Sequence, residues 1–244
     1  MVPPNRYGND GVLRARFNDA VFVSLMRRYL FASNEKVANS TLRRTFQTLE
    51  GGGALPPRYR SQKRWTGPLL QPSDVPDFEG VLADPAFRKF VVVRNPYARL
   101  ISCFRHKFEK GEGAPYRRKL RELGFADRDK ISFSEFLHAI ARQKQEKMNS
   151  HWRVQYYNVF MDVIPYTEII KYEDLSARLP SLIAELYPEQ ANGHNGNGSG
   201  LPILTKNISG SDSEALIDKY FTPELKRLAQ KIYAKDFETF GYPA

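Results

Sequence analysis

The segment at residues 33–41, SNEKVANST, combines a cation, small residues and hydroxyl groups. Lys36 supplies a mobile ammonium group, and Ser40 and Thr41 supply hydroxyl donors at the start of a predicted helix. The first turn of a helix has unpaired N–H groups and the positive end of the helix dipole. Small residues such as Ala38 let this backbone approach an anion closely, so the segment predicts a phosphate-binding loop. An ordinary helix N-cap beside a solvated lysine is the alternative.

A second basic segment, VRNPYARLIS at residues 93–102, follows a predicted strand. The strand delivers Arg94 to its carboxyl end, which is where α/β folds bind ligands. A guanidinium group in this place offers a bidentate fork that suits phosphate. Ser102 follows about two helical turns later, and Arg99 adds positive charge between them. The alternative here is an amphipathic helix with a basic, solvated face.

Both segments need strands before them to hold them in place. Apolar runs rich in β-branched and aromatic residues predict buried strands at residues 30–33, 90–93 and 168–172. Each is followed by a loop and a helical pattern, which is the order of an α/β fold with a parallel sheet. We therefore expect one domain over residues 1–244, with a P-loop-like three-layer α/β/α architecture, a central, mostly parallel sheet and additional helices.

Helix signals lie between and after these strands. Asn95 can cap a helix that has Pro96 in its first turn, and SFSE at residues 132–135 is a capping box. The sequence predicts further helices at residues 20–28, 40–49 and 175–186 and after Thr222-Pro223. Composition predicts flexible segments at residues 1–17 and at the Gly/Asn-rich residues 189–202.

Composition limits the class of protein. The 244 residues are 41% hydrophobic and 26% charged, which is typical of a folded protein with an ordinary core. Lys and Arg (37) exceed Asp and Glu (27), and the net charge of +10 indicates an anionic partner. A single cysteine, Cys103, excludes an intrachain disulfide and a multi-cysteine metal site. The four histidines show no i, i+4 pairing, which argues against structural zinc, and we expect no metal.

Targeting signals are not evident in the sequence. No stretch of this sequence reaches the roughly 18–20 apolar residues that cross a bilayer. Because no apolar region follows the first charged residue, we expect no signal peptide. We expect a cytoplasmic protein. The soluble catalytic domain of a membrane-anchored enzyme is the alternative, because it would have the same composition.

Five segments, in order, resemble motifs of the sulfotransferases that use 3′-phosphoadenosine 5′-phosphosulfate (PAPS). LFASNEKVANST at residues 30–41 resembles their 5′-phosphosulfate loop, and RNPYARLIS at residues 94–102 resembles their 3′-phosphate motif. Three more resemble the carbohydrate branch, of the chondroitin 4-sulfotransferase and HNK-1 sulfotransferase type: HWR at 151–153, KYEDL at 171–175 and YAKDFETFGY at 233–242. The resemblance implies a sulfotransferase domain that acts on a carbohydrate hydroxyl.

The chain also departs from that branch. Glu35 stands where the branch usually has proline, and Asn39 stands where it has cysteine. The cysteine cluster that follows the His-Trp pair in many animal members is missing, which fits a reduced compartment.

The resemblance implies a donor site made of several loops. Lys36 would offset the charge that develops on the leaving 3′-phosphoadenosine 5′-phosphate (PAP). Arg94 and Ser102 would bind the 3′-phosphate, and Arg99 and Lys206 add charge that we expect to converge on the nucleotide. The full set implied for donor binding is Lys36, Val37, Ala38, Asn39, Ser40, Thr41, Arg94, Ser102, Lys206, Asn207 and Ser209.

The acceptor hydroxyl needs a general base. Histidine suits this role because its unperturbed pKa is about 6.5, and His151 lies in a family-like segment. Glu173 or Asp174, after the predicted strand at 168–172, is the alternative base. Trp152 and Arg153 are candidate acceptor contacts, since aromatic faces commonly stack on sugars.

Two other functions are open on the sequence. A P-loop kinase that uses ATP fits the strand–loop–helix order, but the loop at 33–41 has no glycine and does not match G-x-x-x-x-G-K-[ST]. A non-enzymatic binder of nucleic acid or another polyanion fits the charge, but the basic residues are spread along the chain without a nucleic-acid module. We therefore expect a nucleotide sulfate donor and a hydroxylated acceptor as partners, and no nucleic acid.

Overall fold

The computed structural model describes residues 11–53, 67–109, 111–191 and 212–244. The chain divides into two compact units. The first comprises Met1–Asn34, Ala38–Val92 and Val159–Ser209, and the second comprises Glu35–Val37, Val93–Asn158 and Gly210–Ala244. Each unit is described separately below.

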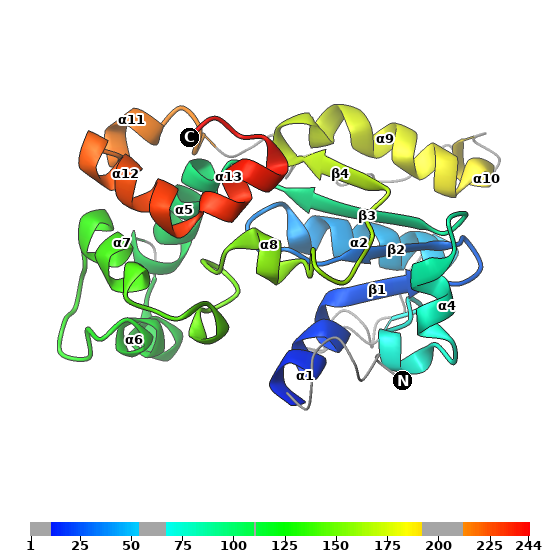
Figure 1. Ribbon diagram of the computed structural model, residues 1–244, viewed down its shortest axis with the longest axis horizontal. Coiled ribbons are helices and arrows are strands. Elements are labelled where there is room, and N and C mark those ends of the chain that lie inside the picture. The colour runs from blue at the N-terminus through cyan, green and yellow to red at the C-terminus, as the bar shows by residue number, and fades with distance from the viewer. Residues whose placement is uncertain (1–10, 54–66, 110, 192–211) are drawn as a thin grey trace. The chain divides into compact units, whose positions relative to one another are not determined.

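A four-stranded sheet with the order β1-β2-β3-β4 forms the centre of the first unit. β1 (Val21–Ser24) pairs antiparallel with β2 (Tyr29–Ala32), and β2 pairs parallel with β3 (Arg88–Val93). β4 (Glu168–Lys171) lies on the other side of β3, and its arrow points in the same direction as those of β2 and β3 (Figure 1). These observations confirm the α/β prediction with a central, mostly parallel sheet.

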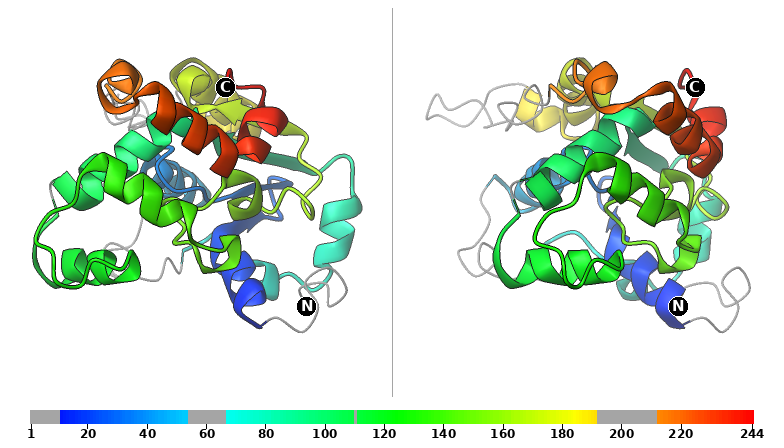
Figure 2. Two further views of the ribbon diagram at one scale, coloured as in Figure 1. Left: turned by 60° about the vertical axis from the view of Figure 1, so that its left-hand side comes forward. Right: turned by 90° about the vertical axis from the view of Figure 1, so that its left-hand side faces the viewer.

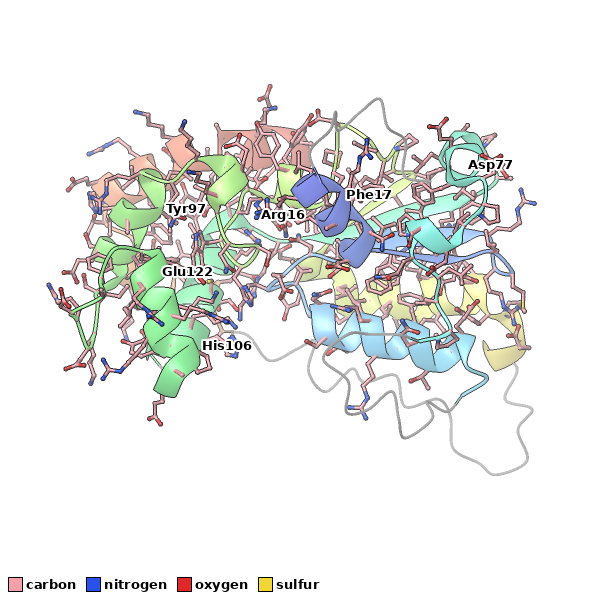
Figure 3. All side chains as sticks on the ribbon, turned by 90° about the horizontal axis from the view of Figure 1, so that it is seen from below. Arg16, Phe17, Asp77, Tyr97, His106 and Glu122 are labelled. Carbon is pink, nitrogen blue, oxygen red and sulfur yellow. The ribbon has the colours of Figure 1, made fainter. Side chains whose placement is uncertain are left out.

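Aromatic side chains fill the space between the sheet and its helices. Phe31 of β2 stacks on Phe90 of β3 at a ring-centroid distance of 5.6 Å, and Phe46 lies 5.4 Å from Phe90. Phe46 belongs to α2 (Asn39–Glu50), which lies on one face of the sheet with α9 (Leu175–Leu186), as seen in Figure 3. Burial of these large apolar surfaces stabilises the layers.

Short helices connect the parts of the first unit. They are η1 (Pro72–Asp74), α4 (Phe78–Ala83), η4 (Tyr172–Asp174) and α10 (Pro188–Ala191). α10 shows that the predicted flexible segment at 189–202 is helical at its beginning, and residues 192–202 lie outside the described residues.

The predicted helix at residues 20–28 is wrong. A helix, α1 (Gly11–Ala20), ends where it was expected to begin, and Val21, Phe22 and Val23 enter strand β1. Their burial and their pairing with β2 decide the conformation, because a short apolar run has no helical or strand periodicity of its own. The fully buried Phe17 also shows that residues 11–17 are not frayed.

Helices make up most of the second unit. α5 (Pro96–Phe104) continues into a π-helical turn, η2 (Arg105–Glu109), and is followed by α6 (Gly113–Glu122) and α7 (Phe133–Ala141). The remaining elements are η3 (Gln145–Lys147), α8 (Gln155–Asn158), α11 (Ile217–Tyr220), α12 (Pro223–Ile232) and α13 (Ala234–Phe240). α12 lies beside α5, α7 and α13, as Figures 1 and 2 show.

The predicted caps of this unit are confirmed. The Asn95 side chain accepts hydrogen bonds from Tyr97 N at 2.9 Å and Ala98 N at 3.4 Å, and Pro96 is the first residue of α5. Ser132 and Glu135 form the reciprocal capping box of α7. The Asn95 cap fixes the beginning of α5, the helix that follows Arg94.

Candidate active site

The backbone of residues 35–38, the Lys36 loop, has an unusual conformation just before α2. Lys36 has a φ of 72° and Ala38 a φ of 60°, both in the left-handed region that residues other than glycine rarely occupy. Ala38 is the N-cap of α2 and directly precedes its right-handed residues. This change of hand is typical of the backbone nests in which successive N–H groups bind an anion. Such strained residues cluster at functional sites.

The first turn of α2 contains the other residues predicted for the donor loop. Asn39, Ser40 and Thr41 begin the helix, and the Asn39 Oδ1 accepts a hydrogen bond from Ser33 Oγ at 2.8 Å. Ser40 is exposed, whereas Asn39 and Thr41 are largely buried. The helix terminus therefore offers N–H groups and one exposed hydroxyl to a ligand.

Arg94 and Lys36 lie together in the second unit. Arg94 directly follows β3 with 1% of its surface exposed, and its Nη1 donates to the Lys36 carbonyl oxygen at 3.3 Å. Its Nη2 lies 3.7 Å from a carboxylate oxygen of Glu214. The guanidinium group thus joins the Lys36 backbone and accommodates an anionic oxygen, as a phosphate-binding arginine must. Ser102, on α5 of the same unit, is half-buried.

Arg99 has a role that the sequence did not indicate. It is 1% exposed, and its guanidinium group donates to the carbonyl oxygens of Glu35, Ser150 and Arg153 at 2.8–2.9 Å. Arg99 therefore ties the residue before Lys36 to the segment around His151, and its charge is directed at carbonyl groups of the protein rather than at a nucleotide. The signal that could have found this role is an arginine within an otherwise apolar helical turn, because a buried guanidinium needs partners in the protein.

His151 is a neutral imidazole held by its neighbours. Its Nδ1 lies 2.8 Å from Asn149 Oδ1 and its Nε2 lies 3.8 Å from a Glu35 carboxylate oxygen. Burial lowers the pKa of His151 to about 3, and the positive charges of Lys107, Lys119, Lys36 and Arg99 act in the same direction. A proton on Nδ1, donated to Asn149, leaves the Nε2 lone pair available, which is the form that a general base needs.

Lys36 lies in the same positively charged surroundings. Burial lowers the pKa of its ammonium group, and Lys107 and Arg94 add to this effect, while Glu35 opposes it. A partly dehydrated ammonium group interacts more strongly with an incoming anion than a solvated one does. Among the described residues, the second unit thus brings Lys36, Arg94 and His151 into one network of contacts.

Trp152 and Arg153 do not fit the predicted role in acceptor binding. Trp152 is fully buried, with its ring 6.0 Å from that of Phe136, and its Nε1 donates to Gln143 at 2.8 Å. Arg153 is 8% exposed and donates to the Met148 carbonyl oxygen. Both side chains are enclosed by protein, so they support the segment that carries His151 and offer no face to a sugar.

Other predicted residues belong to the first unit or lie outside the described residues. Lys206, Asn207 and Ser209 fall within residues 192–211, which the structure does not describe. Glu173 and Asp174 lie in η4 of the first unit, whereas His151 belongs to the second. In the parts of the chain that the structure describes, no group of three His, Cys, Asp or Glu residues could hold a metal ion.

Comparison with known proteins decides the family. The model of the sulfotransferase family matches residues 25–243. The chain belongs to the sulfotransferase family. Carbohydrate sulfotransferase 14 of Danio rerio is 29% identical to this member of the sulfotransferase family over 91% of the chain, and carbohydrate sulfotransferase 10 of Xenopus laevis is 25% identical over 92%. Human carbohydrate sulfotransferase 14 is 28% identical over 64% of the chain.

The relatives are longer than this sulfotransferase family member. The chain spans 62% of the Danio rerio protein, 44% of the human protein and 67% of the Xenopus laevis protein. No solved structure matches the chain significantly. No helix within the described residues is long and apolar enough to span a membrane.

Proposed function

We propose that the protein transfers a sulfuryl group from PAPS to a hydroxyl group of a carbohydrate. The observation that carries this proposal is the network that joins Lys36, Arg94 and the segment of His151 within the second unit. Membership of the sulfotransferase family supports the reaction, and the names of the relatives support a carbohydrate acceptor. The match over residues 25–243 supports a single sulfotransferase domain.

The negative charges of the donor suit the cations and N–H groups that the sequence predicts for donor binding. PAPS carries negative charge at its 5′-phosphosulfate and its 3′-phosphate. We infer that Lys36, the nest at Ala38 and the first turn of α2 bind the 5′ group. Arg94, with Ser102, binds the 3′-phosphate, and this contact distinguishes PAPS from ATP. Lys206, Asn207 and Ser209 stay predicted contacts.

In the transfer step, His151 acts on the attacking acceptor oxygen and Lys36 acts on the leaving phosphate oxygen. The acceptor oxygen attacks sulfur and loses its proton to His151 Nε2, while the bond between sulfur and the bridging phosphate oxygen breaks. The electron pair of that bond stays on the phosphate oxygen of PAP. Lys36 stabilises this charge, and a compact, mobile ammonium group suits the task.

Donor recognition can be tested by calorimetry with PAP, AMP and ATP. We expect PAP to bind at least about tenfold more tightly than AMP, because one well-paired phosphate contact contributes about 1.5–3 kcal/mol. Arg94→Ala should remove this preference, because it deletes the proposed 3′-phosphate contact. Equal affinity for the three nucleotides in the wild-type protein would contradict the proposed donor, and tighter binding of ATP with magnesium would favour a kinase.

The cellular compartment in which the protein works is the subject of a separate proposal. We propose that the domain works in the cytoplasm, because its one cysteine, Cys103, is a buried free thiol and needs no oxidising environment. Fractionation of cells that make the natural full-length protein tests this. Recovery with the cytosolic fraction is expected, and recovery with Golgi membranes would contradict it.

A further inference from the structure

The C-terminal motif at residues 233–242 has no role in the proposed chemistry, yet its side chains contact the segments that carry it. The Tyr233 hydroxyl donates to the carbonyl oxygen of Trp152, next to His151. The Tyr242 hydroxyl donates at 3.4 Å to the carbonyl oxygen of Val93, next to Arg94. The motif therefore contacts both ends of the network within the second unit.

Asp236 makes the strongest of these contacts. It is fully buried, and its carboxylate accepts hydrogen bonds from Gln155 N at 2.9 Å and Tyr156 N at 2.8 Å. The Gln155 side chain also donates to it at 3.3 Å. A buried carboxylate is costly unless several donors satisfy it, and here three do. Asp236 thus fixes both the backbone and the side chain of Gln155.

Gln155 in turn holds the backbone of Arg94. Its Oε1 accepts from Arg94 N at 2.9 Å, and its Nε2 donates to the Arg94 carbonyl oxygen at 2.8 Å. The amide group therefore satisfies both backbone groups of Arg94, as the peptide of a neighbouring strand would. Gln155 is fully buried, so no water competes for these bonds.

We propose that Gln155 and Asp236 are positioning residues for 3′-phosphate recognition, acting through the backbone of Arg94. The inference rests on the proposed function, in which Arg94 binds the 3′-phosphate. The Arg94 guanidinium group lies at the end of a long side chain, so a small rotation of its backbone displaces the group considerably. We call the hydrogen bonds that join Asp236, Gln155 and the Arg94 backbone the clamp. Loss of the clamp should therefore weaken the 3′-phosphate contact and spare the 5′ contacts of the Lys36 loop.

The test compares the affinities for PAP and AMP in variants of the full chain. Gln155→Met preserves the volume of the side chain and removes its hydrogen bonds. We expect its affinity for PAP to fall about tenfold, as for the loss of one to two hydrogen bonds, and its affinity for AMP to change less than twofold. A merely structural defect would lower both affinities together, so the ratio of the two affinities is the readout.

Gln143→Met is the matched control. Gln143 lies in the same unit, and it bonds the Trp152 indole and the Glu122 carbonyl oxygen. We expect this variant to keep the ratio of the wild-type protein. If Gln155→Met does not fold, Asp236→Asn, which is isosteric and weakens the anchor of Gln155, gives the same comparison, and its ratio should also fall.

The possible outcomes separate the inference from the proposed function. If the wild-type protein does not prefer PAP to AMP, the proposed donor is wrong and the inference falls with it. If the wild-type protein prefers PAP, and Arg94→Ala removes the preference while the clamp variants keep it, only the inference is overturned. An equal loss of PAP and AMP binding in the clamp variants also overturns it.

Discussion

His151 and Lys36 differ from typical surface residues because each is partly buried among other cations. Burial is the largest cause of the lowered pKa of both groups, and Lys107 adds to it in each case. The imidazole that results is unprotonated at neutral pH. The segment HWR indicated His151 as the base from the sequence, but its low pKa depends on residues far away in the chain and has no local signal.

The pH dependence of stability tests the burial of His151. Its pKa is about 3 in the folded protein and about 6.5 when unfolded, so the unfolded chain binds more protons below pH 6.5. The contribution of His151 to stability is therefore fully present above pH 6.5 and is lost as the pH falls toward 3, with a slope of up to about 1.4 kcal/mol per pH unit.

Urea denaturation at several pH values between 4 and 7 measures this slope. Asp236, whose pKa burial raises to about 6, contributes in the opposite direction below that pH, so the wild-type protein alone does not isolate the histidine. The informative quantity is the difference between His151→Gln and the wild-type protein. We expect the wild-type protein to lose more stability than the variant as the pH falls. Parallel curves would show that His151 is solvated.

At the scale of elements, the strained backbone of the Lys36 loop predicts how a substitution at Ala38 changes stability. Ala38 has a left-handed backbone, which glycine adopts without steric cost. We expect Ala38→Gly to stabilise the protein by about 0.5–1 kcal/mol. Ala98→Gly is the control, since Ala98 lies inside α5 and the same change there should destabilise by about 1 kcal/mol. Thermal denaturation measures the stability of both variants. Destabilisation by Ala38→Gly would show that the left-handed backbone of Ala38 is not strained.

Local signals predicted most of the elements that hold the site. The β-branched run of β3, the Asn95 cap and the capping box of α7 each identify an element from a few neighbouring residues. β1 was missed because its four residues gain their conformation from pairing with β2. The clamp could not be predicted from neighbouring residues either, because Gln155 and Asp236 are separated by 81 residues in the sequence. Each alone is an ordinary polar residue.

At the scale of the whole molecule, the net charge of +10 divides into two parts. Lys36, Arg94 and Arg99 belong to the proposed donor site or its support. Other cations lie on α6, where Arg117 pairs with Asp129 at 3.3 Å and Lys119 pairs with Glu122 at 3.0 Å. Figure 3 labels Glu122 on this helix. Exposed pairs such as that of Arg117 with Asp129 contribute little to stability. The positive charge in excess of such pairs is available to attract anionic ligands.

This excess predicts how salt affects the choice of acceptor. We expect kcat/KM for a carboxylated or sulfated glycan to fall steeply as ionic strength rises, since salt screens long-range attraction. The value for a neutral glycan should change much less, once the donor is kept saturating. Equal salt dependence for both acceptors would show that the charge serves only the donor or solubility.

The most direct test of the central claim is transfer of labelled sulfate from PAPS to a panel of glycans, by the wild-type protein and by Lys36→Ala. We predict that the wild-type protein labels at least one glycan, and that Lys36→Ala, with an unchanged melting temperature, is slower by about 10²–10³-fold, as for loss of one charge-stabilising donor. Absence of transfer to every acceptor by a protein that binds PAP, or full turnover by Lys36→Ala, would contradict the account.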